Sequence, residues 1–149
     1  MSDARSSRRW IIFFTATAVP TALGFETLAR AFLLPAEFEE VRDFLGPSMT
    51  TLAWGMVALT LVTVLLGIAL QRWMTSRADQ RARERGTAGA EARSSMGPFL
   101  LAASIPQAPA IVAGLTFLAG AELLPVLLAV GLSTTGVCVQ AAMTPPGPA

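Results

Sequence analysis

The stretch Gly97–Leu118, which reads GPFLLAASIPQAPAIVAGLTFL, decides the fold of this chain. It carries no charged residue, and it is long enough to cross a bilayer, whose hydrocarbon core of about 30 Å needs roughly 20 residues as a helix. Pro106 and Pro109 flank Gln107 close to the middle of the stretch. A polar amide beside an interrupted backbone at bilayer depth predicts hydrogen bonding between helices inside a membrane bundle.

The composition of the whole chain agrees with a membrane location. The 149 residues are 53% hydrophobic and only 14% charged, and their mean hydropathy is +0.57. These values are high for a soluble domain. The charged residues are unevenly placed, so that the apolar runs between them predict four transmembrane helices in one membrane domain, residues 1–149. The predicted spans are residues 10–28, 48–70, 97–118 and 123–143.

The charged segments between these spans predict how the chain is threaded. Arg5, Arg8 and Arg9 precede the first span, and the loop 72–93 is rich in arginine. By the positive-inside rule both are cytoplasmic. The acidic connector 35–47 then lies outside, where its helical spacing of apolar residues predicts an amphipathic helix on the membrane surface. The expected fold class is therefore an all-α integral membrane four-helix bundle with N- and C-termini cytoplasmic.

The first apolar run admits two other interpretations. Residues 1–24 resemble a cleaved signal peptide, with a basic start and a small-x-small site at Ala22 and Gly24. The run Ser7-Arg8-Arg9-Trp10 also resembles the start of a twin-arginine export signal. A surface helix is the third interpretation. We favour an uncleaved first helix, because three further spans follow. The absence of Lys and the abundance of Ala, Arg and Gly suggest a GC-rich bacterial genome, and hence the bacterial inner membrane.

Small and polar residues recur at helical spacing on every span and predict its inward face. The Pro106 and Pro109 rings would free the carbonyls of Ala102 and Ile105, for which Gln107 and Ser104 are the expected donors. The predicted inward stripes are Thr17, Thr21 and Gly24; Thr60, Thr63 and Gly67; Ala103, Gln107, Ala110 and Gly114; and Gly131, Thr135, Cys138 and Ala142. A midplane polar layer is predicted at Thr60, Gln107, Thr134 and Thr135.

Two charged features adjoin the spans. Glu26 and Arg30 are one helical turn apart and are predicted to form an interfacial ion pair at the end of the first span. The arginine-rich segment between Arg72 and Arg93 is a candidate for contact with anionic lipid headgroups.

The residue inventory excludes several classes of function. The chain has no His and only one Cys, so the usual zinc, haem-histidine and His-dependent triad sites cannot form within it. A lone cysteine also excludes an intrachain disulfide. The net charge of +1 indicates no general attraction to nucleic acid. We therefore expect no enzyme and no cofactor or metal. The expected function is an accessory or scaffold subunit, as a homo-oligomer or in a larger membrane complex; the alternative is an oligomeric channel or carrier using the layer around Gln107.

The run AASIPQAPAIVAGL, residues 102–115, resembles the second helix of the F-type ATP synthase c subunit, and also the third helix of small bacterial four-span proteins. In the c subunit family a Glu or Asp binds the translocated ion before a pattern of small residues ending in Gly-Leu. That position corresponds to Gln107 here, which cannot carry a proton. The preceding span has only Gly55 and Gly67 in place of the closely spaced glycines of that family. The resemblance implies close helix packing and ring assembly rather than ion translocation.

Overall fold

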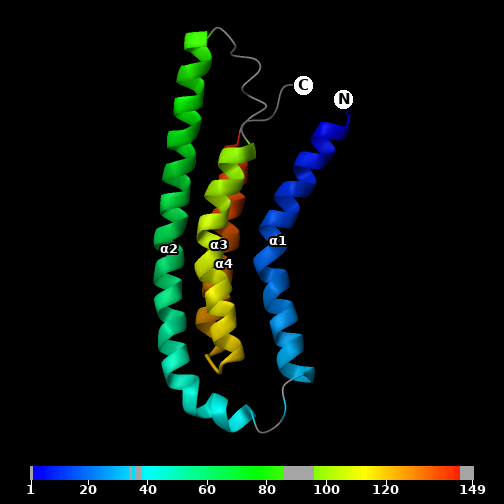
Figure 1. The fold of residues 1–149 in the computed structure, drawn as a ribbon, viewed down its shortest axis with the longest axis vertical. Coiled ribbons are helices and arrows are strands. Elements are labelled where there is room, and N and C mark those ends of the chain that lie inside the picture. The colour runs from blue at the N-terminus through cyan, green and yellow to red at the C-terminus, as the bar shows by residue number, and fades with distance from the viewer. Residues whose placement is uncertain (1, 34, 36–37, 86–95, 145–149) are drawn as a thin grey trace.

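A computed structural model of the chain describes residues 2–33, 35, 38–85 and 96–144, which form four helices and no strand (Figure 1). These are α1 (Ser2–Phe32), α2 (Phe38–Arg85), α3 (Met96–Leu118) and α4 (Leu123–Met143). Each helix is long and apolar enough to cross a membrane. The prediction of four helices able to span a membrane is therefore confirmed, and the structure has the character of a multi-pass membrane protein.

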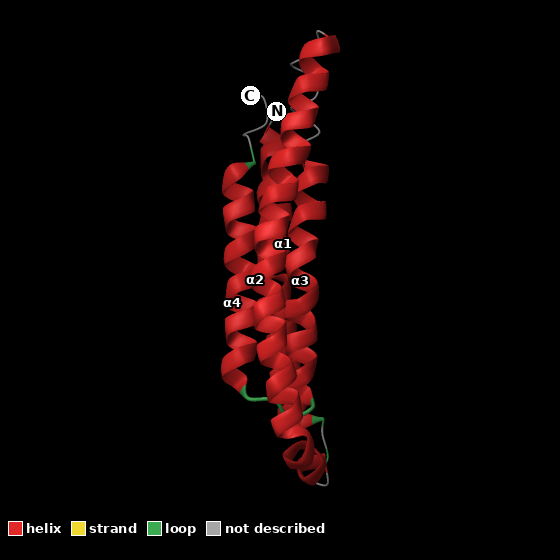
Figure 2. Ribbon diagram, turned by 90° about the vertical axis from the view of Figure 1, so that its left-hand side faces the viewer, coloured by secondary structure: helices red, strands yellow, loops and turns green. Residues whose placement is uncertain are grey.

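Helices α3 and α4 lie between α1 and α2, as the two views at right angles show (Figures 1 and 2). Each of the outer helices packs against both central ones, whereas the described parts of α1 and α2 do not pack against each other. Half of the residues in the most apolar stretch of α3 are buried, whereas only 11% of those in the corresponding stretch of α1 are buried. The proline-containing helix α3 is thus the element around which the other three are arranged.

Three clusters of small apolar side chains form the core, one above the other along the bundle. Alanine and valine predominate, and short side chains allow helix axes to approach closely. Phe99 and Phe117 close the two ends of the core on α3. The clusters comprise Ala53, Phe117, Ala121 and Val126; Val19, Ala110 and Val130; and Phe99, Ala103 and Val137.

Helix α2 is longer than its predicted span and includes most of the acidic connector. Its 48 residues run without interruption past Leu70 to Arg85, so the first part of the predicted loop 72–93 is helical. The segment after Leu70 is rich in Arg, Ala, Gln and Glu, which are strong helix formers. Pro47 lies inside the helix, and the first turns of α2 are directed across the end of the bundle (Figure 1). Proline bends a helix because it removes one backbone hydrogen bond and its ring clashes with the preceding turn. The rest of that loop, residues 86–93, lies outside the described residues.

The bent start of α2 crosses the turn between α3 and α4. Gly120 in this turn has a φ of 112°, a conformation that glycine adopts without steric cost. A Cβ atom on Gly120 would lie 2.5 Å from the carbonyl oxygen of Arg42, and one on Gly46 would lie 3.3 Å from that of Gly120. The hydroxyl of Thr50 accepts a hydrogen bond of 3.0 Å from the backbone N–H of Glu122. These contacts fasten the α3–α4 turn to α2.

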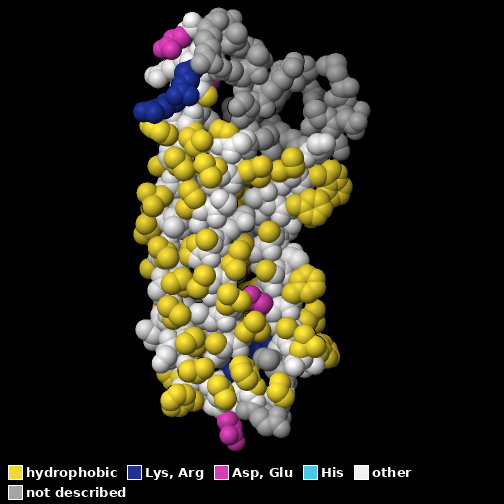
Figure 3. All heavy atoms as spheres, viewed as in Figure 1, with side chains coloured by type: hydrophobic (Ala, Val, Ile, Leu, Met, Phe, Trp, Pro, Cys, Tyr) yellow, Lys and Arg dark blue, Asp and Glu magenta, His cyan; other side chains and the backbone are white. Residues whose placement is uncertain are grey.

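Helix α1 extends beyond both ends of its predicted span and passes Pro20 as one helix. Trp10, Phe13 and Phe14 are exposed on it and contact one another ring to ring. Exposed hydrophobic side chains are spread over the described face of the molecule shown in Figure 3, where charged side chains lie toward the two ends apart from an acidic side chain within the apolar area. A surface of this kind suits a hydrocarbon environment.

Candidate functional site

The four residues of the predicted polar layer do not form one cluster. The buried Thr60 hydroxyl donates to the carbonyl of Met56 in its own helix, at 2.7 Å. The Gln107 side chain donates from Nε2 to the carbonyl of Thr15 in α1, at 2.8 Å. The Thr134 hydroxyl is buried without a partner. Thr135 is exposed, so its predicted inward position is wrong.

Helix order explains why the layer is divided. Gln107 bonds to α1, which packs on one side of the central pair, whereas Thr60 belongs to α2, which packs on the other side. Residues at similar depth in a bundle can therefore face different interfaces. Gln107 serves here as a cross-link between α3 and α1, and bonds of this kind between membrane helices contribute about 0.6–2 kcal/mol.

The carbonyl freed by Pro106 finds a donor that the sequence did not indicate. Gln140 of α4 donates from Nε2 to the carbonyl of Ala102, at a long 3.5 Å. Ser104, one of the two expected donors, bonds to Leu101 in its own helix instead, at 2.8 Å. The predicted roles of Gln107 and Ser104 toward this carbonyl are thus wrong. An exposed carbonyl at this depth still requires a donor, and α4 provides it.

Gln140 belongs to a group of buried polar side chains that we call the amide cluster: Gln71, Gln140 and Thr144. Gln71 donates from Nε2 to the carbonyl of Gln140 and to the hydroxyl of Thr144, both at 3.0 Å. The side-chain oxygens of both glutamines are buried without a hydrogen-bond partner. Amide oxygens accept up to two hydrogen bonds, so the cluster retains capacity for a donor such as water.

A glycine allows α2 to approach the amide cluster. A Cβ atom on Gly67 would lie 2.5 Å from Nε2 of Gln140 and 2.9 Å from the carbonyl oxygen of Ala102. Gly67 and Gln71 are one turn apart on α2 and therefore face the same side. This spacing of a glycine and a glutamine was the available sequence signal for the cluster. Three helices consequently meet at one polar point, with Gly67, Ala102 and Gln140 in contact.

The predicted ion pair between Glu26 and Arg30 is not formed. Oε2 of Glu26 is buried without a hydrogen-bond partner. It packs against Gly114 of α3 so closely that a Cβ atom on Gly114 would lie only 2.5 Å from it. The guanidinium carbon of Arg30 lies 4.5 Å from the centre of the Phe117 ring. Glu26 thus contacts Gly114 and Arg30 contacts Phe117. The two pairs match because Gly114 and Phe117 are also about one helical turn apart on α3. The predicted ion pair considered only residues of the first helix, whereas the contacts that hold both side chains come from α3.

The small-residue stripe predicted to face inward on the fourth span faces outward. We call its members, Gly131, Thr135, Cys138 and Ala142, the outer stripe; all four are exposed. The opposite face of α4 carries Ser133, Gly136 and Gln140, which are buried. Small residues occur on both faces of α4, so their helical spacing alone does not predict which face is buried. The buried face is the one on which Gly136 admits the Val64 side chain; a Cβ atom there would lie 2.7 Å from Cγ2 of Val64.

Within the described residues, no group of three or more His, Cys, Asp or Glu side chains could hold a metal ion. The polar groups that lie between the helices are amides, hydroxyls and the buried carboxylate of Glu26. Comparison with known proteins found no matching family, no similar curated protein and no similar solved structure.

Proposed function

We propose that this chain is a non-catalytic integral membrane protein of the bacterial inner membrane, which serves as an accessory or scaffold subunit of a membrane assembly. The observation that carries this proposal is the outer stripe on α4. Small residues at helical spacing allow another helix to approach closely, and hydroxyl groups then bond across the contact. The bundle packs α4 by its other face and leaves this stripe exposed. The arginine-rich segment is available for contact with anionic lipid headgroups on the cytoplasmic side.

The native mass of the protein, after gentle extraction from its own membrane, tests the proposal. Gly131→Leu should reduce the assembly to the single chain, because it fills the close approach on the outer stripe. No atom lies within 4 Å of a Cβ atom at Gly131, so the fold of the chain itself should be unaffected. Gly55→Leu is the matched control: this glycine of α2 is exposed and also has nothing within 4 Å. A wild-type protein that is a single chain in its membrane, or an assembly indifferent to Gly131→Leu, would contradict the proposal.

Cys138 supplies a second test within the outer stripe. It is the single cysteine and is exposed. Oxidative crosslinking in native membranes should give a dimer of this chain if the stripe meets a second copy. A thiol that is protected in membranes and reactive after detergent extraction indicates a different partner.

A channel or carrier remains the alternative candidate. Ser133 and Thr134 favour it, because their hydroxyls are buried near the middle of α4 without a hydrogen-bond partner. Such groups could line a path for an ion or small solute. Flux in proteoliposomes, measured for the wild type and for Gln107→Leu and Ser133→Ala, tests this candidate. Flux that is absent, or unchanged by both substitutions, removes it.

A further inference from the structure

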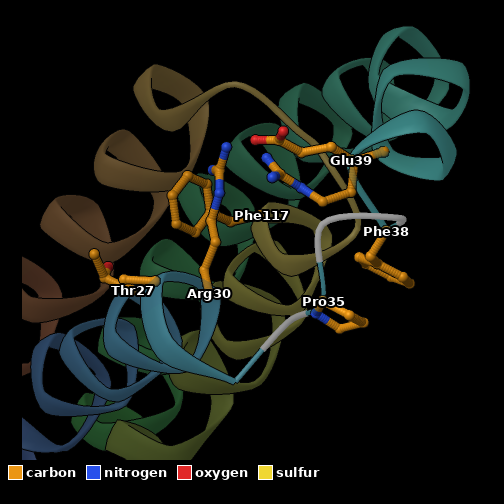
Figure 4. A pocket seen from close by; sticks show the side chains of 8 residues that line it. Thr27, Arg30, Pro35, Phe38, Glu39 and Phe117 are labelled. Carbon is orange, nitrogen blue, oxygen red and sulfur yellow. The ribbon is translucent and has the colours of Figure 1, made fainter.

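A pocket of about 620 Å³ lies where α1 ends and α2 begins, at the opposite end of the bundle from the amide cluster (Figure 4). Side chains from α1, α2 and α3 meet there. Figure 4 shows Arg30 beside the Phe117 ring and Glu39 reaching toward the same space from α2. The residues that line the pocket are Thr27, Arg30, Ala31, Pro35, Phe38, Glu39, Arg42 and Phe117.

The pocket holds two guanidinium groups that are not neutralised by direct ion pairs in the described structure. Arg30 is held over the face of Phe117 at 4.5 Å, a cation–π contact that leaves its N–H groups available. Nε of Arg42 is buried without a hydrogen-bond partner. The two guanidiniums repel each other, and Glu39 attracts Arg30. An unpaired buried N–H and two like charges facing one cavity are costly without a ligand.

The chemistry of the lining defines the ligand. Two arginines and one glutamate give the described residues of the lining a formal charge of +1. Guanidinium groups bind phosphate oxygens through paired hydrogen bonds, and arginine recurs where phosphate is recognised. The Thr27 hydroxyl already donates to the carbonyl of Leu23, at 2.8 Å, so the arginines are the donors available to a ligand. We propose that this pocket binds a phosphate monoanion of the phosphodiester type, held between Arg30 and Arg42.

The surroundings of the pocket favour a lipid as the source of this phosphate. Phe32 and Leu33 at the end of α1 and Phe44 in the first turns of α2 are exposed, with 80%, 78% and 84% of their surface accessible. Pro35 and Phe38 add apolar surface to the lining itself. A phospholipid whose headgroup enters the pocket could lay its acyl chains against such residues, which a free phosphate could not do. The inference is independent of the outer stripe, and it concerns the opposite end of the bundle from the arginine-rich segment.

A phosphatidylglycerol with a photoreactive group close to its headgroup tests the proposal on the full-length protein in nanodiscs. Crosslinked peptides should map to the end of α1 and the start of α2. The double variant Arg30→Gln/Arg42→Gln should lower crosslinking there at least tenfold. Arg77→Gln is the matched control, because Arg77 also stacks on an aromatic ring, that of Trp73 at 4.0 Å, at the far end of α2. Crosslinking at the pocket that the double variant leaves unchanged would overturn the proposal.

A variant with the opposite expected effect guards against loss of the fold. Glu39 is exposed, and Glu39→Gln removes one negative charge from the lining, so crosslinking at the pocket should increase. A decrease would again overturn the proposal. Competition identifies the source of the phosphate. Displacement by unlabelled phosphatidylglycerol, but not by millimolar glycerophosphoglycerol, its soluble deacylated phosphodiester, assigns the site to a lipid. Equal displacement by glycerophosphoglycerol assigns the site to a free phosphodiester.

Discussion

Replacing Gly67 by alanine should destabilise the bundle, whereas the same change at Gly55 should not. Both glycines lie in α2, so each substitution gains the same helix propensity, about 0.5–1 kcal/mol. The surroundings differ. A Cβ atom at Gly55 meets nothing within 4 Å, whereas one at Gly67 would lie 2.5 Å from Nε2 of Gln140 and 2.9 Å from the carbonyl oxygen of Ala102.

The overlap sets the magnitude of this effect. Ordinary contacts begin at 3.4 Å, so the two approaches at Gly67 are too close by about 0.9 Å and about 0.5 Å. Either α2 moves away, or Gln140 leaves the carbonyl of Ala102 without its donor. Overpacking of this kind costs about 1–3 kcal/mol. Gly67→Ala should therefore be about 1–3 kcal/mol less stable than Gly55→Ala.

Equilibrium unfolding in mixed detergent micelles, followed by circular dichroism, measures the free energy of unfolding of both variants. Adding Gln140→Ala to each removes the side chain that Gly67→Ala would strike. The difference between the two alanine variants should then shrink. Equal unfolding free energies for Gly67→Ala and Gly55→Ala would refute the close three-helix contact at the amide cluster.

Three further predictions concern the other helix contacts. Gly114→Ala should destabilise the bundle by about 1–3 kcal/mol, because its Cβ atom would meet the Glu26 carboxylate. Adding Glu26→Ala should remove most of this destabilisation. Thermal unfolding in which the effects of the two substitutions are simply additive would contradict the contact. Gly120→Ala should cost about 1–3 kcal/mol through its positive φ, whereas Gly97→Ala, with open space around it, should cost nothing in the same assay. Gln107→Leu should lose its bond to α1 and about 0.6–2 kcal/mol, seen as faster hydrogen exchange in α1 with α2 unchanged; exchange that is unaltered in α1 argues against the cross-link.

Much of the fold could be predicted from the sequence, because hydrocarbon thickness limits helix length and charged residues interrupt the apolar runs. The inward stripe of α3 was also predicted correctly: Ala103, Ala110 and Gly114 are buried, and Gln107 bonds to another helix. The two ends of α2 were not predicted from the sequence. The Arg-rich segment has few apolar residues but high helix propensity. A prediction of spans from hydropathy therefore does not detect that the helix continues through this segment.

The positions that the prediction missed depend on which helices are neighbours. Glu26 and Arg30 were paired because they share a helix face, but α3 offers each of them a closer contact. Thr135 was placed inside because it lies on a stripe of small residues, but α4 has two such faces. No role was predicted for Gln140, which bonds to the carbonyl that Pro106 exposes on α3. Local sequence does not contain the helix order that decides these contacts.

The uninterrupted course of α2 has a mechanical consequence. From Ser48 to Arg85 the helix rises about 57 Å, more than a bilayer with its headgroups, about 40–45 Å. Figures 1 and 2 show it extending past the ends of α3 and α4. Anything that contacts its tip is held at a fixed height from the bundle. The number of residues between Arg72 and Arg85 therefore sets both a distance and an angle: deleting one residue lowers the tip by about 1.5 Å and turns it by about 100°, at almost unchanged charge and composition.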